Sequence, residues 1–395
     1  MSSILVTDGE ERAALAVVRS LGRAGHRVIV ASPSSRPLAG ASRYCAASLT
    51  VPVPKSDPER YARAVADATA SQRADVLLPI TEASLLALLP HRSRFGDVLL
   101  PFVSADRFAA VCDKRHVLAL ASSLGTAVPR EVTVPSAPAA AVLLASWGAF
   151  PAVVKPFRSV VAAGGGLQKL SVSYAQDREQ LMQLVGALPP EAFPVLVQQR
   201  IVGPGIGVFL LLWDGELLAA FSHRRMREKP PTGGVSVLSE SIPLDPGLLA
   251  ASVALLQRLE WQGVAMVEYK QESASGTPFL MEINGRFWGS LQLAVDAGVD
   301  FPGLLLAAAL GGDPRRMPPY AAGVRLRWTL GHLDHVLARF RGAATRLNGG
   351  SGLLDGCRAL GEFLRYSAPS VHGEILRSSD PRPAVRELAS WLRGQ

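Results

Sequence analysis

Two carboxylates and one amide are spaced so that a β-hairpin would gather them at one end. Glu268 and Glu282 are 14 residues apart, with a polar turn between two strand-like runs. Asn284 is two residues beyond Glu282 and shares its face while the strand continues. Carboxylate and amide oxygens are the hard ligands that suit Mg²⁺, which usually keeps waters and substrate phosphates in its shell. The sequence therefore predicts a Mg²⁺ site at Glu268, Glu282 and Asn284.

A positive charge follows these predicted metal ligands. Arg286 comes two residues after Asn284 and would project a guanidinium toward the same place. Such a group can neutralise charge that develops on a transferred phosphoryl group. Either acid alone is typical of an ordinary strand end, but the combined E-x13-E-x-N-x-R spacing favours phosphoryl chemistry, with Arg286 as the catalytic residue.

A second charged segment, residues 223–228, stands beside a Pro/Gly hinge. His223 and Arg225 could contact a phosphate or a substrate carboxylate there, and His223 is also a candidate base. The alternative is a solvated charged turn. The aromatic residues 287–288, directly after Arg286, could line an acceptor pocket or form a buried shelf.

The elements that must position these residues begin with an alternating pattern. Over the first 100 residues, short apolar runs alternate with helical patterns, which predicts βαβ units and a parallel sheet. The turn after the first run lacks G-x-G-x-x-G, which argues against a dinucleotide-binding oxidoreductase. The predicted strands are 4–7, 27–31 and 75–79, and the predicted helices are 15–21, 61–70 and 83–89.

Further along the chain the pattern changes to strands and hairpins. A helix is predicted from Asp113 to Gly125, and a loop ending in three glycines from Arg158 to Gly166. Asp214-Gly215 is typical of a hairpin turn. The predicted strands are 152–155, 195–199, 207–213, 216–222, 264–270 and 278–283.

Composition limits the class of protein. Of 395 residues, 48% are hydrophobic and 19% charged, which supports a large core and excludes a disordered chain. No uncharged apolar stretch reaches the roughly 18–20 residues of a membrane span, and the N-terminus resembles no secretory leader. Three widely spaced cysteines exclude a disulfide framework and a cysteine-rich zinc site. We expect a cytoplasmic protein that is not integral to a membrane.

Taken together, roughly residues 1–312 resemble the ATP-grasp superfamily. The likeness is to the branch of the carbamoyl-phosphate synthase large subunit and the carboxylate–amine ligases. It is carried by the front α/β domain, Lys114 at a helix start, Lys155 at a strand end before a glycine-rich loop, strand 195–201 and the stretch 281–286.

The resemblance implies an α/β and α+β chain with an ATP-grasp fold. A preATP-grasp (Rossmann-like) domain would precede the two-lobed ATP-grasp domain, and a basic helical C-terminal extension would follow it. The implied boundaries are 1–110, 111–312 (with lobes 111–197 and 198–312) and 313–395.

The resemblance also implies how ATP would be bound. Lys155 and Lys114 match basic residues that contact the nucleotide phosphates, and the glycines fall where the family has a loop that closes over them. Segment 197–201 matches the one that borders adenine. The implied ATP contacts are Lys114, Lys155, Gly164, Gly165, Gly166, Gln198, Gln199 and Ile201.

This chain departs from the family pattern at two points. The adenine-bordering segment usually has Glu, whereas this chain has Gln198-Gln199. The family often has an acid near the ribose a few residues later, whereas this chain reads Gly203-Pro204-Gly205-Ile206-Gly207. The ribose contact is therefore unassigned, and the preference for ATP over GTP follows from the resemblance and not from a base-reading residue.

The C-terminal region is strongly basic. Residues 315–395 contain 13 Arg, no Lys and 6 acidic residues, so they carry +7 of the net charge of +8. They could contact an acidic substrate or partner. The leucine spacing predicts helices packed on the body, with buried faces at Leu326, Leu330, Leu333 and Leu337 and at Val385, Leu388 and Leu392. Trp328, His332, Asp334 and His335 do not have a zinc-site spacing.

These observations predict an ATP-dependent ligase that uses one or two Mg²⁺ ions, with Mn²⁺ as an alternative. It would activate a carboxylate as an acyl phosphate and couple it to an amine, releasing ADP and phosphate. Two alternatives stay open: an enzyme that phosphorylates bicarbonate or carbamate, and a non-catalytic nucleotide-binding regulatory protein. The expected partners are small carboxylates and amines, without nucleic acid, and a homodimer is open.

Overall fold

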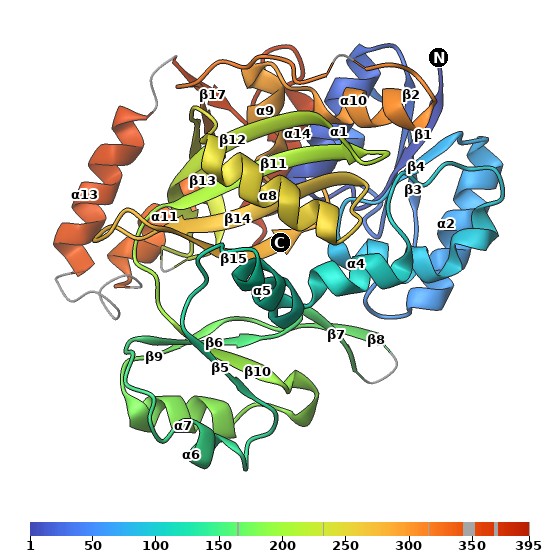
Figure 1. Ribbon diagram of the computed structural model, residues 1–395. Helices are drawn as coiled ribbons and strands as arrows, with labels where there is room; N and C mark the ends of the chain where they lie inside the picture. Colours follow the sequence, from blue (N-terminus) through green and yellow to red (C-terminus); the bar gives the residue numbers. More distant parts are fainter. Residues whose placement is uncertain (164–165, 232, 315, 343–351, 367–369, 395) are drawn as a thin grey trace.

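The computed structural model of the chain describes residues 1–163, 166–231, 233–314, 316–342, 352–366 and 370–394. Helices and strands are mixed throughout, as the predicted α/β and α+β class requires. Three bodies are visible in Figure 1: an N-terminal α/β domain, a small lobe at the bottom of the view, and a large central sheet.

The N-terminal domain is built on a parallel sheet in the order β3-β2-β1-β4. The predicted strands and helices of this domain are present. β3 was not predicted, because its sequence CAASLT has no apolar run and its residues alternate between partly buried and exposed at the sheet edge. The elements are β1 (Ser3–Val6), α1 (Arg12–Arg23), β2 (Arg27–Ser32), β3 (Cys45–Thr50), α2 (Pro58–Gln72), β4 (Val76–Leu78) and α3 (Glu82–Leu88).

Two helices lead from this domain to the small lobe. These are α4 (Ala105–Cys112) and α5 (Lys114–Ser123), and Asp113 caps α5 by accepting a hydrogen bond from the His116 N–H. The small lobe has an antiparallel sheet in the order β5-β10-β6-β9 and a core of its own beneath its helices. Its elements are β5 (Glu131–Val134), α6 (Ala140–Leu143), β6 (Ala152–Pro156), β9 (Ser173–Ala175), α7 (Arg178–Gly186) and β10 (Val195–Gln199).

The predicted glycine-rich loop at 158–166 is in fact largely a hairpin. β7 (Val160–Ala163) pairs with β8 (Gly166–Lys169), because the Val-Val run before the glycines favours a strand. Gly164 and Gly165 lie outside the described residues. The Leu167 N–H donates to the Lys55 carbonyl at 2.5 Å, so the hairpin touches the N-terminal domain.

The large sheet has seven strands in the order β15-β14-β11-β12-β13-β16-β17. Asp214 and Gly215 have positive φ at the β11–β12 turn, as the predicted hairpin requires. β10 runs through the expected lobe boundary at 197/198, so the change of sheet comes after it. The strands are β11 (Gly205–Trp213), β12 (Glu216–Lys229), β13 (Val235–Ser241), β14 (Gly263–Gln271), β15 (Pro278–Asn284), β16 (Arg325–Arg327) and β17 (Val371–Gly373).

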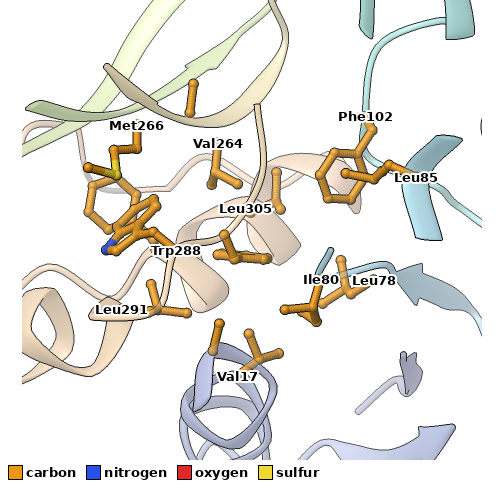
Figure 2. Close-up of a cluster of buried hydrophobic side chains, with 14 of the residues drawn as sticks. Val17, Leu78, Ile80, Leu85, Phe102, Val264, Met266, Trp288, Leu291 and Leu305 are labelled. Carbon is orange, nitrogen blue, oxygen red and sulfur yellow. The ribbon is translucent and has the colours of Figure 1, made fainter. Parts of the chain in front are cut away.

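Helices cover the large sheet on both sides. α8 (Pro246–Arg258) lies on one face, where the Ser252 and Tyr269 hydroxyls are 2.9 Å apart. α9 (Leu291–Ala297) and α10 (Phe301–Ala309) lie between the other face and α1. Figure 2 shows the shared core, in which Val17 and Leu78 of the N-terminal domain approach Val264 and Leu305. One continuous core thus fixes the N-terminal domain against the large sheet.

The C-terminal extension is tied into both of these bodies. It contains α11 (Thr329–Phe340), α13 (Gly352–Arg365) and α14 (Arg382–Leu392), but it also adds β16 and β17 to the large sheet. Arg19 of α1 pairs with Asp380 at 2.9 Å, both almost fully buried, and Arg377 pairs with Asp296 at 2.5 Å. Arg12 pairs with Glu374.

The predicted apolar faces of the extension are wrong. Leu326 is buried, but in β16, and α11 buries Gly331, His332, His335 and Val336 instead of the leucine stripe. In α14, Val385 is 69% and Leu392 70% exposed. The ion pairs and the two added strands hold the extension on the rest of the protein. The leucine spacing therefore does not determine which helix faces are buried.

Among the described residues, no single helix is both long and apolar enough to cross a membrane. α9 and α10 reach that length and composition only as a pair, and they are bent by 91° relative to each other.

Candidate active site

The two predicted metal-binding acids lie directly opposite each other. β14 and β15 pair in antiparallel register with Glu268 across from Glu282, and an irregularity follows at Tyr269. The Glu282 side chain is 30% exposed and that of Glu268 is 13% exposed. The hairpin therefore presents both carboxylates side by side on one face.

Two lysines from different elements surround Glu282. Lys114, the first residue of α5, places Nζ 3.2 Å from Glu282 Oε2 and 2.7 Å from Ser159 Oγ. Lys155 of β6 is also close enough for its charge to act on this acid. Burial alone would raise the pKa of Glu282, but Lys114 and Lys155 outweigh it and bring the pKa to about 2. Glu282 is therefore ionised at neutral pH.

The second lysine, Lys155, has a pKa below its ordinary value. Burial lowers its pKa to about 8, with Glu282 opposing that shift and Lys114 adding to it. Lys155 lies across from Leu196 of β10, on the face of the small sheet that turns toward the large sheet. A bound anion would therefore stabilise the charged form of Lys155.

Glu268 is bound by Arg225 instead of by a lysine. Arg225 Nη1 and Nη2 lie 2.8 and 2.6 Å from the two Glu268 carboxylate oxygens, and Nη1 is 3.1 Å from Glu228 Oε1. Arg225 must cross β11 to reach Glu268, and a Cβ at Gly205 would lie only 3.0 Å from its Cδ. The absence of a side chain at Gly205 therefore makes room for this bidentate pair. We call Lys114, Lys155, Arg225, Glu268 and Glu282 the carboxylate cluster.

Asn284 links Glu282 to Arg286. The Asn284 amide donates from Nδ2 to Glu282 Oε1 at 3.2 Å, and its Oδ1 accepts from Arg286 Nη2 at 2.8 Å. Arg286 Nη1 also donates to the Phe287 carbonyl at 2.9 Å. The structure thus joins Glu282, Asn284 and Arg286 in one row, with the guanidinium held by its own turn.

His223 lies beneath this surface and is not part of it. It is 1% exposed, its Nδ1 is 3.3 Å from Ser290 Oγ, and its ring stands edge-on to Phe209. Burial lowers the pKa of His223 well below its ordinary value, so the ring is neutral. Phe287 and Trp288 are buried as well, which favours the buried-shelf alternative over an open pocket lining.

The three residues of the predicted adenine segment separate. Gln198 faces the large sheet, is 1% exposed and donates from Nε2 to Glu131 Oε2 at 2.6 Å. Gln199 lies on the opposite face of β10, opposite Ala152. Ile201 is buried just after the strand.

Sequence reasoning missed two acids and one hydroxyl of this region. Glu131 on β5 is the cross-strand neighbour of Gln198. Glu228 Oε1 lies 3.6 Å from where a Gly205 side chain would begin, so an acid does reach that position, but from β12. Ser159 holds Lys114. The pairing of separate strands makes these residues neighbours of the site. No spacing along the sequence predicts that pairing.

The donor set fits Mg²⁺. Two opposed carboxylates, one of them with a strongly lowered pKa, and a neighbouring amide offer the hard oxygen atoms that this ion prefers, although Arg225 and Arg286 now bind the oxygens of Glu268 and Asn284. No group of three or more His, Cys, Asp or Glu in the described part of the chain is arranged to hold a metal ion. His332 and His335 are both buried, the His332 ring lies 5.1 Å from the Phe363 ring, and Asp334 pairs with Lys229.

Comparison with known proteins identifies the fold. Residues 191–331 match the family described as "ATP-grasp in the biosynthetic pathway with Ter operon". The structure is similar to L-amino acid ligase from Bacillus licheniformis, with 17% identity and a TM-score of 0.60 over 80% of this chain and 75% of that one. The chain has the ATP-grasp fold. No curated protein sequence matches it.

Two other ATP-grasp-like structures are similar over most of their length. Biotin carboxylase from Campylobacter jejuni has 16% identity and a TM-score of 0.65, over 82% of this chain and 74% of that one. N5-carboxyaminoimidazole synthetase from Staphylococcus aureus has 14% identity and a TM-score of 0.62, over 81% and 80%. The ATP-grasp fold predicted from the sequence is confirmed.

Proposed function

We propose that this ATP-grasp chain is an ATP- and Mg²⁺-dependent ligase that joins a carboxylate to an amine. The observation that carries the proposal is the opposed pair Glu268 and Glu282, flanked by Lys114 and Lys155 and followed by Arg286. Cations on both sides of paired acids suit a metal-bound triphosphate. The similar structures named above include one ligase that acts on amino acids, which supports this direction.

In this proposal, each group has one task. Lys114 and Lys155 bind the phosphates, and Arg286 faces the oxygen that gains charge. Glu268, Glu282 and Asn284 would hold Mg²⁺, which supplies positive charge to the phosphate oxygens when bound. A substrate carboxylate oxygen attacks the γ-phosphorus and ADP leaves. The amine then attacks the acyl carbon, phosphate leaves, and the amine loses a proton to solvent.

The nucleotide would lie between the two lobes. The triphosphate would extend from Lys155 toward Glu282, and the ribose would lie near Gly205. Glu228 stands there and can accept hydrogen bonds from ribose hydroxyls, which fills the contact that the sequence left unassigned.

The proposal also includes the domain division and location. We keep domain boundaries near residues 110 and 312 as part of this proposal. The free cysteines suit a reducing cytoplasm. The basic extension would face an acidic substrate or partner.

An ADP-release screen tests the proposal. Pairs of carboxylates and amines are offered with ATP and Mg²⁺, with bicarbonate as a separate arm. A ligase gives ADP release that needs both a carboxylate and an amine, and a product with a new C–N bond. Release with bicarbonate alone would favour the carboxylating alternative. Tight nucleotide binding without release in any arm would favour the regulatory alternative.

A further inference from the structure

The outer face of α13 is apolar. Four of its leucines are between 41% and 67% exposed, and the exposed Cys357 lies among them. Positions 353, 357, 360 and 364 recur at spacings of four, three and four residues, so their side chains form one stripe along the helix. Figure 1 shows α13 at the edge of the molecule. The leucines of this stripe, which we call the leucine stripe, are Leu353, Leu354, Leu360 and Leu364.

The opposite face of α13 is packed on α11, which fixes the direction of the leucine stripe. Gly356 is buried against the Phe340 ring, where a side chain on the helix would not fit. Asp355, on the packed side, pairs with Arg339 of α11. α13 therefore cannot turn its leucines inward without losing these contacts.

The charges of α13 that have no ion-pair partner are both positive. Glu362, the second acid of the helix, accepts a hydrogen bond from Arg227 of β12 at 2.8 Å. Arg358 and Arg365 are exposed, form no ion pair among the described residues, and lie along one edge of the leucine stripe. An exposed apolar stripe with cations beside it is typical of helices that lie in the interface of an anionic membrane.

A second copy of the chain fits this face less well. Two copies of α13 packed about a two-fold axis would set the arginine edge of one helix against the same edge of the other, where like charges repel. The helix has 14 residues, so the stripe is about 21 Å long and about 10 Å wide. That area is well below the about 800 Å² that a stable dimer buries on each partner.

We propose that α13 is a membrane-binding helix that inserts the leucine stripe into the surface of an anionic lipid bilayer. The leucines would enter the boundary between headgroups and acyl chains, while Arg358 and Arg365 contact the lipid phosphates. The helix would lie in the plane of the surface, because its other face stays packed on the protein. The proposal does not depend on the ligase reaction, since none of these residues belongs to the carboxylate cluster.

Co-sedimentation of the full chain with lipid vesicles tests the proposal. Vesicles of phosphatidylcholine alone are compared with vesicles of equal parts phosphatidylcholine and phosphatidylglycerol. We expect at least about tenfold tighter binding to the anionic vesicles, because each arginine near such a surface contributes about fivefold. Binding should weaken as the salt concentration rises.

Paired substitutions separate the two contributions to binding. Leu353→Glu with Leu364→Glu should weaken binding to the anionic vesicles by at least about tenfold. Arg358→Ser with Arg365→Ser should remove most of the preference for anionic over neutral vesicles. Val142→Glu, at a 79% exposed position on α6 of the small lobe, is the matched control and should bind as wild type does.

A second measurement follows the leucine stripe itself. Cys357 is the only exposed cysteine of the three, so a polarity-sensitive fluorophore can be attached to it. Its emission should shift to the blue when anionic vesicles are added, because the label moves from water into lipid. The substituted positions are exposed, so the melting temperatures of all variants should match that of the wild type.

Three outcomes would overturn the proposal. The first is a wild-type protein that sediments with neither kind of vesicle. The second is binding to anionic vesicles that survives the two leucine substitutions in folded protein, which would place the lipid contact elsewhere. The third is a dimer in solution that these leucine substitutions dissociate, without vesicle binding, which would assign the leucine stripe to a second copy of the chain.

Discussion

The carboxylate cluster and a second set of charges beneath the C-terminal extension are both largely buried, yet their bonding differs. In the second set, which we call the docking cluster, each ion pair joins elements far apart in sequence. Arg19 also donates to the carbonyls of Glu374, Ile375 and Asp380, so each of its three guanidinium nitrogens has a partner. The docking cluster consists of Arg12, Arg19, Asp296, Glu374, Arg377 and Asp380.

In the carboxylate cluster, the cations can exchange their present bonds for bonds to a bound anion. Lys155 has its pKa lowered by burial, and both oxygens of Glu268 are held by Arg225. A polyanion with its metal would satisfy these groups better than the protein does alone. Under the proposed function, buried charge stabilises the fold in one region and serves a bound ligand in the other.

Removing the C-terminal extension should have the largest effect, because it removes half of the docking cluster. A chain truncated after Asp313 loses β16, β17 and the acids that pair with Arg12 and Arg19. We expect insoluble or strongly destabilised protein, measured by soluble yield and thermal unfolding, whereas a chain ending at Leu392 should behave as wild type. A soluble truncated chain with an unchanged melting temperature and full ADP release would make the extension a separate module.

Glu282→Ala should abolish turnover while the fold remains. It removes the acid with the lowest pKa in the carboxylate cluster, and the hairpin backbone stays paired. We expect ADP release to fall by at least about 100-fold, with a melting temperature within a few degrees of wild type. Glu272→Ala, in the exposed turn of the same hairpin, is the matched control. Near-wild-type release at millimolar Mg²⁺ would contradict the metal assignment.

Arg19→Met should have the opposite effect to Glu282→Ala: lower stability with unchanged turnover. It leaves Asp380 buried without its charge partner, which costs about 3–5 kcal/mol of unfolding free energy in denaturant titration. Turnover per folded molecule should not change. Arg316→Met breaks the exposed pair with Glu216, whose side chains are 58% and 63% exposed, and should cost less than about 1 kcal/mol. Equal losses in the two variants would show that burial does not distinguish them.

Lys155→Met should weaken ATP binding by about 10- to 100-fold, because a charge-assisted phosphate contact is lost. Titration calorimetry measures the affinity, and an unchanged value would remove Lys155 from the site.

The lowered pKa of Lys155 gives this prediction a pH signature. With a pKa of about 8, roughly half of the free protein carries the uncharged amine at pH 8. ATP favours the charged amine, so binding should take up about half a proton at pH 8, and affinity should fall as the pH rises through 8. Calorimetry in buffers of different ionisation enthalpy measures the uptake, which should be smaller by that amount in Lys155→Met.

Glu228→Gln should have the smallest effect, a loss of about three- to tenfold in ATP affinity. If Glu228 accepts from ribose hydroxyls, 2′,3′-dideoxy-ATP should bind wild type and variant equally. A loss that persists with the dideoxy analogue would assign Glu228 to holding Arg225 instead.

The strand pairing of the carboxylates followed from local sequence. Two strand-like runs and a short turn leave one hairpin register, so Glu268 and Glu282 had to meet. The parallel front sheet likewise followed from alternating apolar runs. The hairpin at 160–169 and strand β3 were missed, since glycine-rich or weakly apolar segments do not show their pairing locally.

The sequence by itself determined which chemistry was at hand: the two acids, the amide, the guanidinium and the lysines, with the hairpin that presents the acids. Only the tertiary structure decided which of these residues pair with each other. Arg225 binds Glu268 across a glycine, Gln198 donates to Glu131, and Arg19 binds Asp380, all between residues on separate strands or elements. It also decided that α14 leaves Val385 and Leu392 in solvent. Local periodicity fixes the faces an element has, but the partner on the other side comes from distant segments whose packing no short spacing encodes.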